Sequence, residues 1–441
     1  MSRLDVYGPP LMEYQGNGSL IFDESTQMQV DFKCIQLHNG DIYVHVSFLE
    51  TVGFNIINNR NHIEAIRGHL DDGRSFKSIG EVLVRERNIT NYGSGMRVDG
   101  LLILSQIKIE LIDNGTTSVA TKLDFYLTNL KFIGSEMRWL TPNRQYGVLP
   151  LEINGLNITI YPDINYDNLV KKMESTKTAT VTSYLEIYLN ILSKEDILSL
   201  VTHLCSLLSF AKGTEIIWPY YQEVDDTGKV ITSIHNSCIS SNFGSWELIP
   251  FNALNLKPFL ETTYDRYVSL LNEYELNEII HTIVSSKLDG SFLELRALNI
   301  TSAIDVLRGR WAKPHGRIQI TSQNKFDKCR KLLKILINDF VKLEIQPDQI
   351  SQMLNKIPEL NRPSLGDILK EMVIDIGAEV SIDRIEAFIK TRNKLVHQSR
   401  FATENQYQEF TDIIHLADLL IIALLGYHGP YIDCRNWSRV Q

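Results

Sequence analysis

Two kinds of hydrophobic pattern divide the chain. Within the first 160 residues, apolar and polar positions alternate in short runs, which include 29–37, 41–48, 100–112 and 119–127. A period of two is typical of β-strands with one buried face. Residue pairs that tolerate positive φ separate the runs, as at Asn39-Gly40, Asp72-Gly73 and Asn114-Gly115. We therefore predict an N-terminal antiparallel β-rich domain over residues 1–160, with a sandwich or barrel-like form.

Residues 161–264 have a mixed pattern. The apolar side chains of 196–210 recur at helical spacing, whereas 215–219 and 229–235 flank Asp225-Asp226-Thr227-Gly228 in the manner of a hairpin. The pattern places the boundary at residue 160 only to within about ten residues. This section is therefore either a separate domain or the end of the first one.

From residue 265 onward the pattern becomes helical. The spacing predicts helices over 265–287, 291–311, 325–343, 347–357, 365–376, 381–399 and 406–426. Ser381 and Asp383 suit a helix start, and Gly426 suits a C-terminal cap. The expected fold is therefore multidomain α+β, in which residues 265–441 form an all-α helical bundle.

Charge and cysteine usage narrow the functional classes. The formal net charge of −9 argues against a broad basic surface for nucleic acid, so any RNA contact should be local and sensitive to salt. The five cysteines are scattered and form no CxxC pair, which argues against a disulfide framework or a zinc site. We expect no metal and no organic cofactor.

No targeting or membrane segment is expected. The N-terminus lacks an apolar core of the signal-peptide type. The most apolar run, 413–425, is too short to cross a bilayer and contains His415 and Asp418. These two residues are three apart, so we expect them to share a helix face, either as a buried polar pair or as residues that line a functional cleft. The sequence favours a cytoplasmic protein.

The segment Ile385–Arg400, IEAFIKTRNKLVHQSR, carries the strongest chemical signal. His397 suits general base or acid catalysis, because an unperturbed imidazole titrates near neutrality. Arg392 suits stabilisation of a pentavalent phosphate, and Asn393 suits orientation of the imidazole or of a phosphate oxygen. Such a site would use the ribose 2′-hydroxyl as nucleophile and would cut RNA without a metal. The cations Lys390, Lys394 and Arg400 are candidates for phosphate binding.

The Arg-x4-His spacing by itself is weak evidence. With gaps of four to six residues allowed, about 1.6 matches are expected by chance. A second match does occur, where Arg308 and Arg310 precede His315. We reject it because Gly309 and Pro314 would break a helix there. The context of Arg392 is better, with an amphipathic helix before it and a long apolar helix after it.

This combination resembles the HEPN superfamily, whose members place an R-N-x-x-x-H-like element beside the last long helix of a bundle. The resemblance extends to Ser291–Leu307, a helix that in the family ends with an acidic residue. Asp305 occupies that position here. The resemblance implies that Asp305 approaches the Arg/His pair as a further catalytic residue. The layout is also similar to the ApeA-like branch, with a GxxxDGR-like element at Gly68–Arg74.

The HEPN resemblance implies a function. It implies an endoribonuclease of a prokaryotic antiviral-defence or toxin type, with RNA as substrate and tRNA as one candidate. It implies a homodimer in which Arg and His from two protomers form a composite site. The β-rich domain would sense or recruit a phage-derived or other trigger. The alternative is a catalytically inactive HEPN module that binds RNA, a nucleotide or a partner protein.

Overall fold

The computed structural model divides the chain into two compact units. Unit 1 comprises residues 1–264 with 429–432 and 441, and unit 2 comprises residues 265–428 and 433–440. The residues described are 10–23, 26–50, 62–92, 95–111, 119–142, 144–189, 192–238, 243–244, 246–288, 290–339 and 345–440. An antiparallel β-rich N-terminal region followed by a helical C-terminal region is confirmed.

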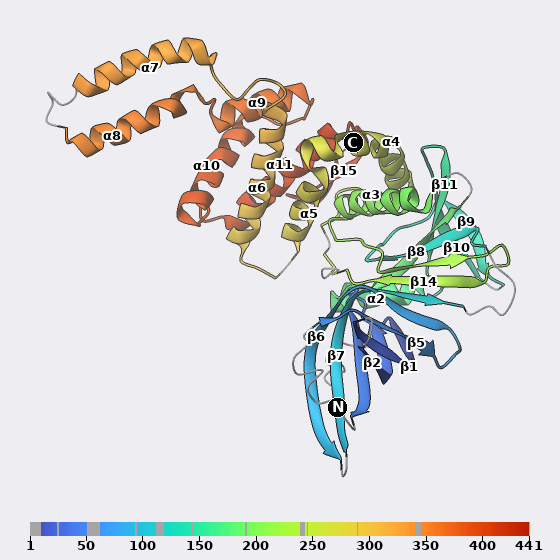
Figure 1. The fold of residues 1–441 in the computed structure, drawn as a ribbon. Helices are drawn as coiled ribbons and strands as arrows, with labels where there is room; N and C mark the ends of the chain where they lie inside the picture. The colour runs from blue at the N-terminus through green and yellow to red at the C-terminus, as the bar shows by residue number, and fades with distance from the viewer. Residues whose placement is uncertain are drawn as a thin grey trace. The chain divides into compact units, whose positions relative to one another are not determined.

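Within the described residues of unit 1, fourteen strands form one sheet (Figure 1). They are β1 (Met12–Asp23), β2 (Thr26–Gln36), β3 (Ile42–Glu50), β4 (His62–Ile63), β5 (Ala65–Leu70), β6 (Ser75–Tyr92), β7 (Gly95–Glu110), β8 (Lys122–Thr128), β9 (Glu136–Thr141), β10 (Arg144–Ile153), β11 (Leu156–Pro162), β12 (Val181–Tyr188), β13 (Tyr220–Val224) and β14 (Val230–Asn236). Their order is β4-β6-β5-β1-β2-β3-β7-β14-β13-β8-β12-β11-β10-β9, and every pairing of consecutive neighbours is antiparallel where a register is given.

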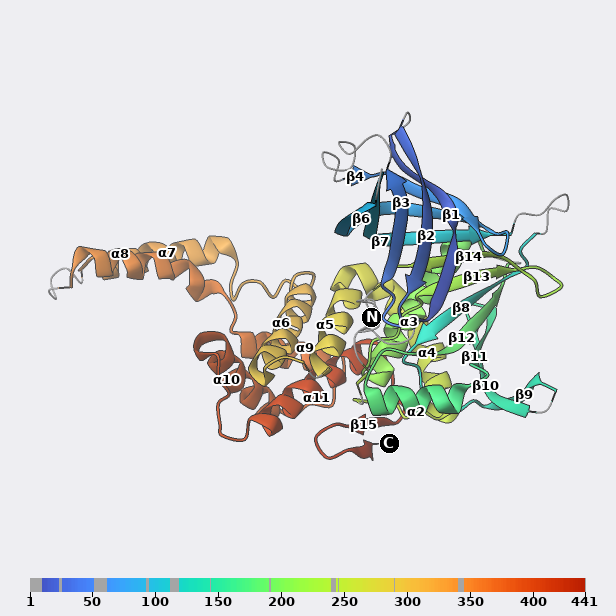
Figure 2. The same cartoon turned by 90° about the horizontal axis from the view of Figure 1, so that it is seen from below.

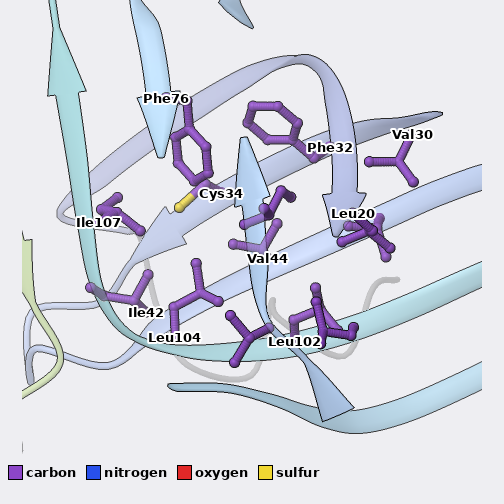
Figure 3. Close-up of a cluster of buried hydrophobic side chains, with 14 of the residues drawn as sticks. Leu20, Val30, Phe32, Cys34, Ile42, Val44, Phe76, Leu102, Leu104 and Ile107 are labelled. Atoms are coloured by element: carbon purple, nitrogen blue, oxygen red, sulfur yellow. The ribbon is translucent and has the colours of Figure 1, made fainter. Parts of the chain in front are cut away.

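The first part of the sheet closes on itself. β6 pairs with β5 on one side and with β7 on the other, so β6, β5, β1, β2, β3 and β7 form a ring of strands. Alternate side chains point into the ring and form a continuous apolar core (Figure 3). Phe32 and Phe76 meet there with ring centroids 4.6 Å apart. The period-two alternation of the sequence thus reflects a genuine inner and outer face.

The second part of the sheet continues from β7 through β14 to β9, and two helices accompany it. They are α2 (Tyr166–Thr176) and α3 (Lys194–Lys212). Ser193 caps α3 by accepting a hydrogen bond from the Asp196 amide. β11 spans the expected boundary at residue 160, and strands from both sides of it belong to the same sheet.

One local prediction in unit 1 is wrong, and one segment with the composition of a turn lies within a strand. The first arm of the expected hairpin is not at 215–219, because β13 runs from Tyr220 to Val224 and pairs there with β14. Gly16-Asn17-Gly18, which has the composition of a turn, lies inside β1. A Cβ atom on Gly16 or Gly18 would come within 2.1 Å of a carbonyl oxygen of β5. These glycines therefore permit a close approach of two strands. The expected turn at Asn114-Gly115 falls outside the described residues.

Unit 2 is helical. Its helices are the end of α4 (Ala253–Tyr274), α5 (Leu276–Lys287), α6 (Leu293–Ala312), α7 (Gln323–Asn338), α8 (Pro347–Lys356), the 3-10 helix η3 (Ile357–Asn361), α9 (Leu365–Asp375), α10 (Ile382–Gln398) and α11 (Gln406–Leu424). Two short strands follow in the sequence, β15 (Tyr431–Asp433) and β16 (Ser438–Val440), and they pair with each other. α6 contacts α5, α9, α10 and α11, whereas α7 and α8 lie side by side and contact η3 (Figures 1 and 2). None of the described helices combines the length and the apolar character that crossing a membrane requires.

His415 and Asp418 are both buried on α11, as expected, but their polar partners come from other elements. Asp418 on α11 accepts two hydrogen bonds from Lys287 Nζ at the end of α5, at 2.7 and 2.9 Å. Both side chains are almost completely buried. His415 lies on the same helix, but its Nδ1 faces Asp433 Oδ1 at 3.6 Å. Residues three apart share a helix face, but the partner of each one is decided by the elements that pack on that face.

Candidate functional site

The segment predicted to carry chemistry forms α10. It begins after Ser381, has Asp383 in its first turn and ends at Gln398, where Ser399 adopts a left-handed conformation with φ of 52°. Its buried side chains are Ile385, Phe388, Thr391 and Leu395. Their spacing fixes the helix rotation, so each remaining residue has a defined direction.

Arg392 forms an ion pair with Asp305 across the interface of α10 and α6. Its Nη2 and Nε donate to Asp305 Oδ2 at 2.8 and 3.3 Å. Both side chains are about one-quarter exposed, at 23% each. Its Nη1 donates to Asn393 Oδ1 at 3.3 Å. A guanidinium group has five N–H donors, so these three contacts leave two for a further anion.

A second guanidinium group lies beside Asp305, and the sequence reasoning did not include it. Arg308 Nε is 3.9 Å from Asp305 Oδ1. No residue of the described part of the chain hydrogen-bonds Oδ1 or Arg308 Nε, although both atoms are buried. The cluster of Asp305, Arg308 and Arg392 therefore has one excess positive charge, which favours a phosphate nearby. The i, i+3 spacing of Asp305 and Arg308 was the available sequence signal.

His397 lies in the last turn of α10 and is exposed, as is Asn393. At 100° per residue, Arg392 and His397 point roughly 140° apart on the helix. His397 instead shares the exposed side of α10 with Lys390 and Asn393, which precede it by seven and four residues. Within the chain, Arg392 therefore faces α6 while His397 faces solvent.

The predicted phosphate-binding cations cluster only in part. Lys394 Nζ and Arg400 Nε both donate to Gln398 Oε1, at 3.3 and 2.9 Å, so these two lie together at the end of α10. Lys390 is exposed one turn earlier. The end of this helix thus presents three cations and one imidazole to solvent.

Glu409 on α11 holds the segment that follows α10. Its carboxylate accepts hydrogen bonds from the Thr391 hydroxyl at 2.6 Å and from the amides of Ala402 and Thr403. Burial raises the pKa of this carboxyl group, but the hydrogen bonds from Thr391, Thr403 and Ala402 outweigh it and bring the pKa below its ordinary value. Glu409 therefore stays ionised and fixes the turn after His397.

The second Arg/His match lies partly within a helix, so the expectation that Gly309 would break one there is wrong. α6 continues through Gly309 and ends at Ala312, before Pro314. His315 lies beyond the helix, where it stacks on Trp311 with ring centroids 4.5 Å apart. Its Nδ1 is 2.7 Å from the Trp311 carbonyl oxygen. His315 is therefore held by Trp311, and its Nε2 lies 3.5 Å from Asp375 Oδ2.

In the described part of the chain, one group has the composition of a metal site: His415, Asp433 and Cys434, all buried. Asp433, however, already pairs with Arg435 through both carboxylate oxygens. Cys434 Sγ donates to the Thr411 carbonyl oxygen at 3.6 Å, and burial raises the pKa of this thiol to about 12. Asp433 and Cys434 are therefore already engaged by protein partners, which makes the group a poor site for a cation.

Comparison of the chain with models of known families, with curated proteins and with solved structures finds no match. The HEPN resemblance therefore rests on the α10 motif and on its contact with Asp305.

Proposed function

We propose that the protein is a metal-independent endoribonuclease of HEPN type. It would act in the cytoplasm of a prokaryotic cell, in antiviral defence or as a toxin, and cleave RNA, with tRNA as one candidate. The observation that carries the proposal is the ion pair between Arg392 and Asp305. The family pattern brings an acidic residue of the earlier helix to the arginine, and the two residues here meet across 87 positions of sequence.

The chemistry assigns one role to each residue. The ribose 2′-oxygen attacks phosphorus, and the bond to the 5′-oxygen breaks, giving a 2′,3′-cyclic phosphate and a 5′-hydroxyl group. His397 removes the 2′-hydroxyl proton or donates a proton to the leaving oxygen. Arg392 stabilises the pentavalent transition state with its remaining N–H donors. Asn393 and Asp305 position Arg392, and Lys390, Lys394 and Arg400 bind the phosphate backbone.

The directions of the side chains support a site that is shared between two protomers. Arg392 faces α6 and His397 faces solvent. A second copy that places its own His397 over the quarter-exposed guanidinium group of Arg392 would bring the two groups into one cleft. Each cleft of a homodimer would then use Arg392 from one protomer and His397 from the other.

The test is RNA cleavage by the purified full chain in the presence of EDTA. We expect cutting of a tRNA or mRNA pool, with loss of roughly 10³-fold or more in both Arg392→Ala and His397→Ala. His315→Ala is the matched control, because it removes the histidine of the second motif, and it should cut like the wild type. Cleavage that needs a divalent metal, or that survives His397→Ala, contradicts the proposal.

The second candidate is a binding module without activity. The exposure of His397, apart from Arg392, favours it, because the isolated protomer does not assemble both groups around one phosphate. In that case, His397→Ala changes only the affinity for RNA, a nucleotide or a partner protein, and neither the wild type nor the variant cuts.

A further inference from the structure

A partly enclosed cavity of about 260 Å³ lies between α10 and α11 in unit 2, apart from the contact of Arg392 with Asp305. Its lining positions follow i, i+3, i+4, i+7 spacing on each helix, from Arg384 to Thr391 and from Glu409 to Leu416. The floor is apolar and buried, formed by Phe388, Ile413 and Leu416. A ligand can therefore rest an apolar group against two facing helix surfaces.

Arg384 lines this cavity and has one unsatisfied N–H donor. Its Nη2 atom is buried, and no residue of the described part of the chain hydrogen-bonds it. A buried charged donor without an acceptor is costly, and such atoms in folded proteins usually meet water or a ligand. Arg435 also lines the cavity, but it already binds Asp433 through two nitrogens. Arg384 is therefore the group that an incoming anion would meet.

The cavity also offers negative charge. Asp412 lines it at the exposed end, whereas Glu409 is occupied by Thr391 and two backbone amides. Two arginines and two carboxylates give the lining no formal net charge, and Asp433 adds a negative charge beside it. A multiply charged anion such as a nucleotide therefore gains little electrostatic binding energy there. A zwitterion matches both the unsatisfied Nη2 of Arg384 and the carboxylate of Asp412.

We propose that this cavity binds a free α-amino acid with an apolar side chain. The carboxylate pairs with Arg384, the ammonium group pairs with Asp412, and the side chain packs on Phe388, Ile413 and Leu416. The volume of about 260 Å³ lies just below the range of roughly 300–1,000 Å³ that drug-sized ligands occupy, which suits a single amino acid. The inference does not depend on RNA cleavage.

The test measures binding to the full chain by calorimetry and thermal unfolding. The probes are L-leucine, L-methionine and L-phenylalanine, together with leucinamide, which lacks the carboxylate, and N-acetyl-leucine, which lacks the ammonium group. We expect at least one amino acid to bind and, at tenfold its dissociation constant, to raise Tm by about 3 °C. Each leucine analogue should bind about tenfold more weakly or worse than the parent.

Variants locate the site. Arg384→Met removes the guanidinium group, and Ala387→Phe fills the cavity from the exposed side of α10; both should lower the affinity at least about tenfold. Arg362→Met is the matched control, because Arg362 is exposed and does not line the cavity, and it should bind like the wild type. The Tm of each variant without ligand shows whether it folds. If Arg384→Met does not fold, Ala387→Phe still decides the test.

Three outcomes overturn the inference. The first is the absence of heat and of a Tm shift with all three amino acids up to about 10 mM. The second is amino-acid binding that neither Arg384→Met nor Ala387→Phe weakens. The third is binding of inorganic phosphate or AMP that depends on Arg384, without any binding of amino acids.

Discussion

Asp305 controls where the guanidinium group of Arg392 points. It accepts from Nε and Nη2 through a single oxygen, so the remaining N–H groups are held in one direction. A side chain as long as arginine otherwise samples many rotamers, and an ion pair that is three-quarters buried restricts them. Asp305 is thus a positioning residue for the proposed reaction, and it acts through Arg392.

Replacing Asp305 should weaken cleavage less than replacing Arg392. We expect Asp305→Ala to lower kcat/KM by roughly 10- to 100-fold, because the guanidinium group stays present but is no longer held in place. In an Arg392→Ala background, the same change should have almost no further effect. Single-turnover cleavage rates of the wild type, the two single variants and the double variant measure this coupling. Independent, multiplicative losses would show that Asp305 does not act through Arg392.

His235 in unit 1 should make stability depend on pH. It is fully buried, with Nε2 at 3.1 Å from the Tyr14 hydroxyl and Nδ1 at 2.8 Å from Gln36 Oε1. Burial, aided by the charge of Arg74, lowers its pKa from 6.5 to about 3. Below pH 6.5 the unfolded chain therefore takes up a proton that the folded chain does not. Stability should fall as the pH drops toward 3.

Urea unfolding checks this pH effect. Between about pH 7.5 and 5.5, His235 alone should lower the free energy of unfolding by about 1.4 kcal/mol. The glutamine of His235→Gln cannot be protonated. The free energy of unfolding of this variant should therefore fall by about 1.4 kcal/mol less than that of the wild type over this interval. Equal losses in both proteins would mean that His235 titrates in the folded state as it does in the unfolded chain.

At the level of single residues, the sequence predicts chemistry better than geometry. The identities of Arg392, Asn393 and His397 follow from a local motif. The contact with Asp305 was expected only from the family resemblance, because spacing along one helix contains no information about a partner 87 residues away. Arg308 was missed for a different reason: it belonged to a match that had been rejected on account of Gly309, which α6 tolerates.

Individual elements depend on a few close contacts. β1 and β5 pair so closely that Cβ atoms on Gly16, Gly18 and Gly68 would each come within 2.1–2.2 Å of a backbone oxygen of the other strand. Backbone atoms cannot move aside as a flexible side chain can. Glycine is therefore needed at the point where these two strands meet.

Gly18→Ala should destabilise unit 1 by about 1–3 kcal/mol or more, because the new methyl group meets the Arg67 carbonyl oxygen. Gly309→Ala is the matched control. It lies in α6 with no atom within 4 Å of the place that its new methyl group would occupy, and it should stabilise by about 0.5–1 kcal/mol through helix propensity. Chemical denaturation of both variants measures the change in the free energy of unfolding, which should be negative for Gly18→Ala and positive for Gly309→Ala. A neutral Gly18→Ala would show that the strands lie further apart.

The buried pair of Lys287 and Asp418 joins α5 to α11. Lys287→Met leaves a buried carboxylate without its cation and should cost about 3–5 kcal/mol. The double variant Lys287→Met with Asp418→Leu should recover most of this loss, since an apolar pair of similar volume packs in the same place. Thermal and urea unfolding provide the values. A double variant as unstable as the single one would show that the pair contributes more than its own charges.

Helices were easier to predict from the sequence than the breaks between them. The expected helix 265–287 is in fact two, because Glu275 adopts φ of 54° between α4 and α5. Tyr274 and Leu276 are both buried, so the apolar positions continue through the break. Hydrophobic periodicity cannot reveal a change of direction that occupies one residue.

The long-range strand pairing of the sheet in unit 1 could not have been predicted from the sequence. Alternation predicts strands and their inner faces, but pairings such as β14 with β7 join segments more than one hundred residues apart. The same long-range pairings carry the sheet through the expected boundary at residue 160. The antiparallel character, by contrast, follows from the short turns between successive strands.

The proposed dimer gives a prediction for the whole molecule. If each cleft combines Arg392 of one protomer with His397 of the other, a heterodimer of Arg392→Ala and His397→Ala retains one intact cleft. Mixing the two inactive variants under subunit exchange should then restore about a quarter of wild-type activity. Native mass spectrometry confirms that heterodimers have formed. Heterodimers without activity would contradict a composite site.

The chemistry of the cut ends tests the central proposal most directly. RNA would be incubated with the full chain in EDTA and the new termini identified by mass spectrometry. Attack by the 2′-hydroxyl group predicts 2′,3′-cyclic phosphates and 5′-hydroxyl groups, and no cut at a position where the RNA carries a 2′-deoxyribose. Termini with 3′-hydroxyl and 5′-phosphate groups, or cutting at the deoxy position, would contradict a metal-independent site built on Arg392 and His397.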